Sequence, residues 1–152
     1  MEVFDQETAA RVWQRVQRRE GFAEPETGQE DPVSLMLQSH ALAGLYLGMQ
    51  RRFTGAGAER IRRLYRQHRE TIACLKGLCR LSGTAPGLPP MEAGSGDTAD
   101  RLRSCAHRER RLGAAFARLA AEGEFAQVYA QLSRQAGERC REVLQLLGEL
   151  EK

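Results

Sequence analysis

The sequence has almost no lysine, few aromatic residues and no long apolar run. Only Lys76 and Lys152 are lysines, so the remaining 21 of the 23 basic residues are arginines. No apolar stretch approaches the ~20 residues that a membrane-spanning helix needs. The N-terminal stretch, residues 1–17, is amphipathic and lacks the apolar centre of a signal peptide. We therefore expect a cytoplasmic protein with no membrane partner.

Aromatic residues make up only 6% of the chain, which limits stacking on nucleic-acid bases. A basic helix face is nevertheless present, formed by Arg60, Arg62, Arg63, Arg66 and Arg69. No nucleic-acid reader motif accompanies it, so we expect a solvated helix surface and no nucleic-acid partner. Binding of a nucleic acid or another acidic ligand to this face is the alternative, and salt-dependent binding would reveal it.

The cysteine content also excludes several kinds of site. The chain has four cysteines, each inside a helical pattern, and none forms a Cys-x-x-Cys or a Cys/His zinc spacing: Cys74, Cys79, Cys105 and Cys140. We expect reduced, mostly buried thiols rather than disulfides.

A length of 152 residues with 41% apolar content suits a single compact domain over residues 1–152. Residues 1–30 predict an N-terminal helix, anchored by Trp13, and a polar linker. Two helix pairs are predicted at residues 31–81 and 98–152. The Gly/Pro-rich residues 82–97 between them are longer than a tight turn requires.

Apolar periodicity predicts the helices of both pairs. The first begins at Asp31-Pro32 and continues to Phe53, and the turn Thr54–Ala58 leads into a helix ending near Leu81. The third opens at Thr98 or Asp100, with His107 on an exposed face, and the fourth runs from about Phe125 to Leu150. The inward positions of the third helix are Leu102, Cys105, Glu109, Leu112, Phe116 and Leu119. Those of the fourth helix are Leu132, Ala136, Arg139, Val143, Leu146 and Leu150. Two antiparallel pairs joined by one long crossover describe an all-α, ferritin-like four-helix bundle.

Polar residues interrupt the apolar stripe of every bundle helix at a similar depth. In the stretch Ile61–Leu78 they are His68 and Thr71, one turn apart. The other helices contribute Ser39, Glu109, and Ala136 with Arg139, while His40 lies beside the stripe. In bundles with a dinuclear carboxylate centre, two helices supply one Glu each and the other two supply Glu-x-x-His. The interrupted positions have the same arrangement, because two helices have one such position each and the other two have a pair of positions three residues apart.

Three sequence features carry a family resemblance. They are Ser39-x-x-Leu42-x-x-x-Tyr46, Cys74–Leu78 followed by the crossover, and Glu138–Gly148. With these features the chain resembles the rubrerythrin- and ferritin-like superfamily, specifically small ferritin-like proteins of anaerobic bacteria. The resemblance covers residues 35–150 and implies a bacterial protein with a ferritin-like fold. Bundles of this class often pair through a helical face, which leaves a homodimer open.

The resemblance also shows what has changed at the ligand positions. Ser39, His68 and Ala136 replace glutamates of the family, Thr71 and Arg139 replace histidines, and only Glu109 matches. We expect no metal and no cofactor, with Glu109 and Arg139 instead forming an internal ion pair closed by Ser39, His68 and Thr71.

Two functional classes follow. The first is a non-enzymatic binding or assembly module with an unknown protein or small ligand as its partner. The alternative is a rubrerythrin-like redox enzyme that retains iron or manganese at His68 and Glu109. The chain has no Cys-x-x-Cys module of the rubredoxin type, which favours the first class.

Overall fold

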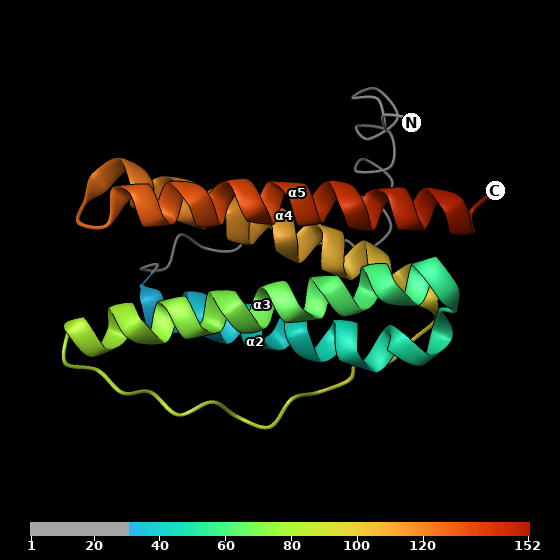
Figure 1. Ribbon diagram of the computed structural model, residues 1–152, viewed down its shortest axis with the longest axis horizontal. Coiled ribbons are helices and arrows are strands. Elements are labelled where there is room, and N and C mark those ends of the chain that lie inside the picture. The colour runs from blue at the N-terminus through green and yellow to red at the C-terminus, as the bar shows by residue number, and fades with distance from the viewer. Residues whose placement is uncertain (1–30) are drawn as a thin grey trace. The chain divides into compact units, whose positions relative to one another are not determined.

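The computed structural model describes residues 31–152, and these residues are helical apart from their connections (Figure 1). The helices are α2 (Pro32–Met49), α3 (Gly55–Leu81), α4 (Thr98–Glu122) and α5 (Ala126–Leu150), with a 3₁₀ turn η1 (Gln50–Arg52) after α2. They form two compact units, one containing α2, α3 and the segment that follows, the other containing α4 and α5. Four helices in two pairs confirm the all-α prediction for this part of the chain. The predicted helix around Trp13 lies outside the described residues, and a single domain for the whole chain stays a prediction.

The first helix pair begins with the predicted cap. The Asp31 carboxylate accepts a hydrogen bond from the Ser34 amide at 2.8 Å, and Pro32 follows in the first turn. The prediction that this helix continues to Phe53 is wrong. The α-helix ends at Met49, η1 tightens the last turn, and Phe53 is extended (φ −120°, ψ 153°). α3 then starts at Gly55, whose φ of +55° favours glycine, so the connection lies earlier in the chain than the predicted turn Thr54–Ala58.

α2 and α3 pack along their lengths and bury the predicted stripes. The buried apolar residues of α3 include Ile61, Leu64, Ile72, Leu75 and Leu78, and those of α2 include Leu35, Leu42, Tyr46 and Met49. α2 differs from the other helices because its sequence contains no charged residue. A helix that is apolar around most of its circumference must be covered on more than one face.

The second covered face of α2 lies under the connection that follows α3. His40 Nε2 donates a hydrogen bond to the Pro89 carbonyl oxygen at 2.6 Å. Gly44 and Gly48 lie one and two turns further along α2, close against this connection. A Cβ on Gly44 would be 2.5 Å from the Glu92 carbonyl oxygen, and a Cβ on Gly48 would be 2.6 Å from the Ala93 carbonyl oxygen. Residues 89–93 therefore run parallel to α2, held against its backbone by two glycines.

The second helix pair, α4 and α5, also packs along its length. The Asp97 carboxylate caps α4 by accepting from the Asp100 amide at 2.8 Å, which places the helix start at Thr98. α4 ends before Gly123, and Phe125 precedes α5 in the left-handed region (φ 65°). Leu102, Leu112, Phe116, Leu132, Val143 and Leu146 are buried as predicted. Leu150 was expected inside but is 47% exposed, because it is the last residue of α5.

Among residues 31–152, no helix combines the length and the apolar character that a membrane span requires.

Candidate functional site: two buried polar pairs

The first buried polar pair lies between α4 and α5. The Nε of Arg139 donates to both carboxylate oxygens of Glu109, at 3.0 Å to Oε1 and 3.1 Å to Oε2. The side chains are 1% and 0% exposed, respectively. A charge removed from water to this extent requires an opposite charge beside it. The predicted ion pair between Glu109 and Arg139 is present.

The guanidinium of Arg139 is only partly used by this contact. Its Nη1 and Nη2 are buried and have no hydrogen-bond partner within residues 31–152. A bidentate pair would use Nε and Nη2 together, one for each carboxylate oxygen, whereas here Nε alone serves both. The unused N–H groups require acceptors such as water or an anion, because an unsatisfied buried donor costs about 1–3 kcal/mol.

The second polar pair lies between α2 and α3. His68 Nδ1 and Ser39 Oγ are 3.1 Å apart, and both residues are fully buried. The ring of Tyr46, two helical turns after Ser39 on α2, stacks on the His68 imidazole with a centroid distance of 5.7 Å. The imidazole is thus held by a hydroxyl on its edge and an aromatic ring on its face.

The remaining predicted positions are buried without joining either pair. Thr71 Oγ1 is buried and has no hydrogen-bond partner among the described residues. Ala136 lies against Gly113 of α4, where a Cβ would be 3.3 Å from that of Ala136. The two polar pairs belong to different helix pairs, so a network that connects them stays a prediction.

Two histidines are placed differently from the prediction. His40, expected beside the seam and outside the interior, is only 8% exposed because the connection that follows α3 covers it. The prediction that His107 is exposed is wrong, since it is 5% exposed. The buried face of α4 is broader than one seam and also includes Arg103, one turn before His107. That arginine reaches Asp100 at 2.7 Å and also pairs with Glu151.

The residues at the predicted ligand positions do not fit a dinuclear metal centre. Such a centre uses four carboxylates and two imidazoles, whereas these positions supply Glu109, His68 and no other ligand of either kind. Arg139 takes both oxygens of that carboxylate and adds a positive charge. Within each described helix pair, no three His, Cys, Asp or Glu side chains gather in a metal-binding cluster.

None of the four cysteines forms a disulfide, as predicted. Cys79 and Cys105 are buried, while Cys74 and Cys140 are half-buried. Burial, followed by the negative charge of Glu109, raises the pKa of Cys140 from 9.0 to about 12. Its thiol donates a weak hydrogen bond to the Ala106 carbonyl oxygen at 3.4 Å. This cysteine stays a neutral thiol at neutral pH and is a poor nucleophile.

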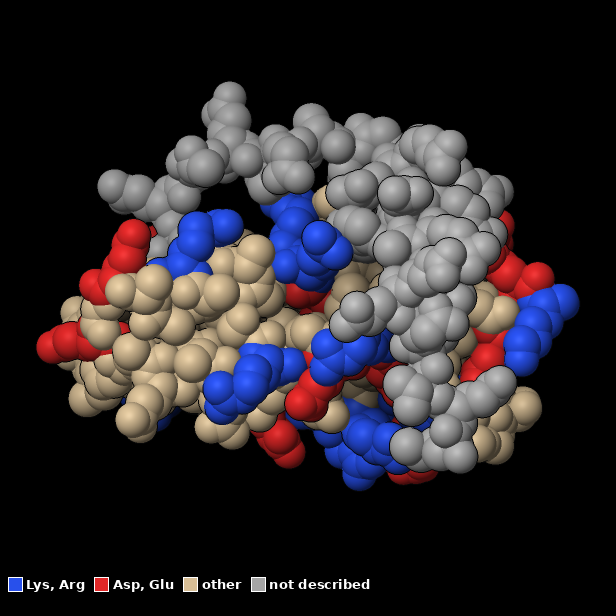
Figure 2. Space-filling model, turned by 90° about the horizontal axis from the view of Figure 1, so that it is seen from above, with Lys and Arg blue, Asp and Glu red and all other residues tan. Residues whose placement is uncertain are grey.

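The predicted arginine face of α3 is largely exposed, with only Arg60 half-buried. Glu59 pairs with Arg62 and, at 3.2 Å, with Arg66. On the face of the molecule shown in Figure 2, basic and acidic side chains of the described residues are interspersed.

Comparisons with protein-family models, with curated proteins and with solved structures found no match to this chain.

Proposed function

We propose that this protein is a ferritin-like four-helix bundle whose dinuclear metal centre has been replaced by side-chain partners. In this proposal it is a non-enzymatic binding or assembly module. The observation that carries the proposal is the buried contact between Arg139 and Glu109. In the family pattern a metal cation neutralises the carboxylate at the position of Glu109. Here the guanidinium supplies that charge permanently.

The electrostatics of this contact disfavour a metal at the same carboxylate. At ~4 Å and an effective dielectric constant of ~20, Arg139 would repel a cation by about 4 kcal/mol for each unit of charge. The N–H groups of Arg139 that have no partner call for an acceptor, and a metal ion is not one. Both facts support a metal-independent core.

The crossover supports the bundle architecture. A ferritin-like fold needs a long connection that returns along the first helix pair. Residues 89–93 follow α2 in the direction of the helix, fixed at His40, Gly44 and Gly48. This is the course that the fold requires of the segment after its second helix.

The rival proposal is a rubrerythrin-like redox protein with iron or manganese at His68 and Glu109. It needs both side chains as ligands. Arg139 engages both oxygens of Glu109, so a metal at this carboxylate would have to displace the guanidinium. The binding-module proposal requires no such exchange of partners.

Metal content tests the two proposals. Protein purified without chelators should carry well below one equivalent of iron, manganese or zinc. Stoichiometric metal that survives dialysis, is lost in Glu109→Ala and persists in Glu59→Ala would overturn the metal-independent proposal. Glu59 is a matched control because its carboxylate is exposed on α3.

A further inference from the structure

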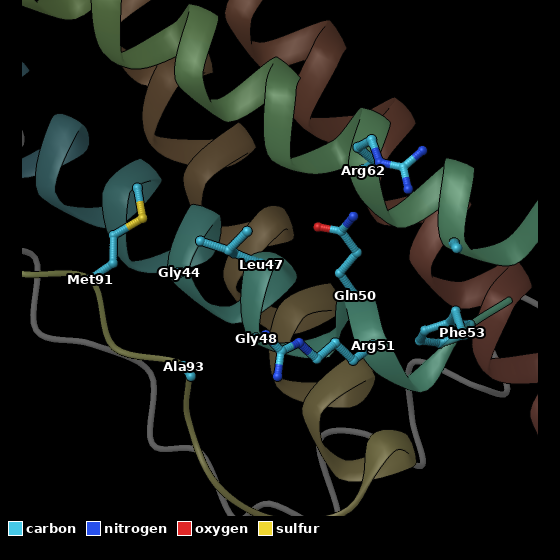
Figure 3. Close-up of a pocket in the computed structure, with 10 residues that line it drawn as sticks. Gly44, Leu47, Gly48, Gln50, Arg51, Phe53, Arg62, Met91 and Ala93 are labelled. Carbon is cyan, nitrogen blue, oxygen red and sulfur yellow. The ribbon is translucent and has the colours of Figure 1, made fainter.

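A pocket of about 780 Å³ opens where the end of α2, the start of α3 and the crossover meet. All its lining residues belong to the first helix pair and its connection, as Figure 3 shows. Its volume lies within the range of small-molecule sites, about 300–1,000 Å³. It uses none of the residues in the two buried polar pairs.

The walls of this pocket are fixed by close contacts. Met91 and Ala93 form one wall, on the part of the crossover that lies against Gly44 and Gly48. The hydrogen bond from His40 to Pro89 holds the same segment one turn earlier along α2. A pocket whose walls are already in place needs little ordering on binding, which favours affinity.

The lining of the pocket is mainly apolar. Leu47, Phe53, Ala58 and Met91 contribute apolar side chains. Leu47 is 43% exposed and so presents apolar surface to the pocket. An apolar body placed in the pocket would cover this surface and gain hydrophobic free energy.

The charges in the lining all have one sign. Arg51 and Arg62 are present, and the lining includes no aspartate or glutamate. Arg62 is already engaged by Glu59. With its amide oxygen facing Arg62, Gln50 also accepts from Nε at 3.1 Å and Nη2 at 3.2 Å.

Arg51 differs from Arg62 in its interactions. It has no hydrogen bond or ion pair with another side chain in the described part of the chain. In Figure 3 its side chain extends beside Gly48 along the pocket. A guanidinium presents a planar fork of N–H donors that matches a carboxylate. It is the group in this pocket that is ready to receive an anion.

We infer that this pocket binds a small organic carboxylate with an apolar body, and that Arg51 holds the carboxylate. The apolar body lies against Leu47, Phe53 and Met91. This inference builds on the proposed role as a binding module and gives its ligand class. It does not depend on the state of Glu109 and Arg139.

The test uses octanoate as the probe and octan-1-ol as its uncharged counterpart, followed by amide chemical shifts of the full chain. Octanoate should shift the resonances of residues 44–53 and 91–93, and octan-1-ol should bind at least about tenfold more weakly. Arg51→Gln should weaken octanoate binding about tenfold and leave octan-1-ol unchanged, because only the charge-assisted contact is lost. Arg69→Gln removes an exposed arginine of α3 outside the pocket and should change neither.

A second variant places a negative charge inside the pocket. Ala58→Glu lies in the first turn of α3, where a carboxylate favours the helix, and an unchanged helical circular dichroism spectrum would show that the variant folds. It should abolish octanoate binding. Equal binding of octanoate and octan-1-ol, or octanoate binding unaffected by both Arg51→Gln and Ala58→Glu, would overturn the inference. Metal analysis of the same samples separates the two proposals, since bound metal contradicts only the first and absent octanoate binding contradicts only the second.

Discussion

Arg139 on α5 shares one hydrogen, that of Nε, between both carboxylate oxygens of Glu109 on α4. The pair is excluded from water, so neither side chain can lose its partner without leaving a buried charge. Removing one partner should therefore lower the free energy of unfolding more than removing both.

Single substitutions in this pair should be costly. Glu109→Leu or Arg139→Met alone should lower the free energy of unfolding by roughly 3–5 kcal/mol. The double variant should lose much less, because no buried charge remains. Urea denaturation of all four proteins completes the cycle. Additive losses would show that the two side chains do not interact.

Introducing the ligands of a ferritin-like dinuclear centre should create a metal site if the bundle proposal is correct. The variant combines Ser39→Glu, His68→Glu, Thr71→His, Ala136→Glu and Arg139→His with the native Glu109. Without metal it should be less stable than the parent, because four carboxylates repel one another. Ferrous or manganous ions should raise its melting temperature, saturating near two ions per chain, because they bind only the folded state.

The close contact of Ala136 with Gly113 makes Ala136→Glu the most demanding of these changes. A version that retains Ala136 therefore serves as a second test, with weaker metal binding expected. If either version folds and neither binds metal, the assigned register of the ligand positions is wrong.

The glycines under the connection that follows α3 should not tolerate a methyl group. Alanine has the better helix propensity, yet Gly44→Ala should cost about 1–3 kcal/mol because its Cβ meets the Glu92 backbone. Gly77→Ala on α3 is the matched control, since nothing lies within 4 Å of its Cβ position. It should stabilise by about 0.5–1 kcal/mol. Equal stabilisation by both substitutions in thermal or urea unfolding would contradict the close contact.

Cys140 should make the stability sensitive to alkaline pH. Its pKa is about 12 in the folded protein against 9.0 ordinarily, so between these values the unfolded chain releases a proton that the folded protein keeps. The contribution is complete below pH 9 and is lost as pH rises toward 12. Urea midpoints measured on both sides of pH 9 should fall less steeply in Cys140→Ala and Cys140→Ser than in the parent. Identical slopes in all three proteins would exclude Cys140 as the cause.

The buried pair was predictable because a polar residue inside an apolar stripe has few alternatives to a partner. Glu109 and Arg139 both occupy seam positions, and opposite charges at a similar depth satisfy each other. Ser39 and His68 follow the same reasoning. The predicted position of Thr71 was correct, but its hydrogen bonding was not, because a seam pattern fixes depth and not the direction of a hydroxyl group.

The contacts between α2 and the connection after α3 were not predictable by the same means. A glycine inside a helix indicates either a locally less stable helix or a close approach of another backbone segment, and apolar periodicity does not distinguish these. The row His40, Gly44 and Gly48, spaced by one turn on a helix without charges, was the available signal. The burial of His107 was missed for a related reason, because seam positions alone underestimate the width of a buried face.

The attachment of residues 89–93 to α2 also limits where the length of the connection after α3 can change. Between His40 and Gly48 the helix advances about 12 Å, and the four extended steps from Pro89 to Ala93 cover about 13 Å. One inserted residue within these steps would move Glu92 and Ala93 away from the two glycines. Gly83 and Gly87, by contrast, have no neighbouring atom within 4 Å of their Cβ positions. Insertions, protease cleavage and engineered chain ends should therefore be tolerated near residues 83–87 and not within residues 89–93, whose backbone is fixed against α2.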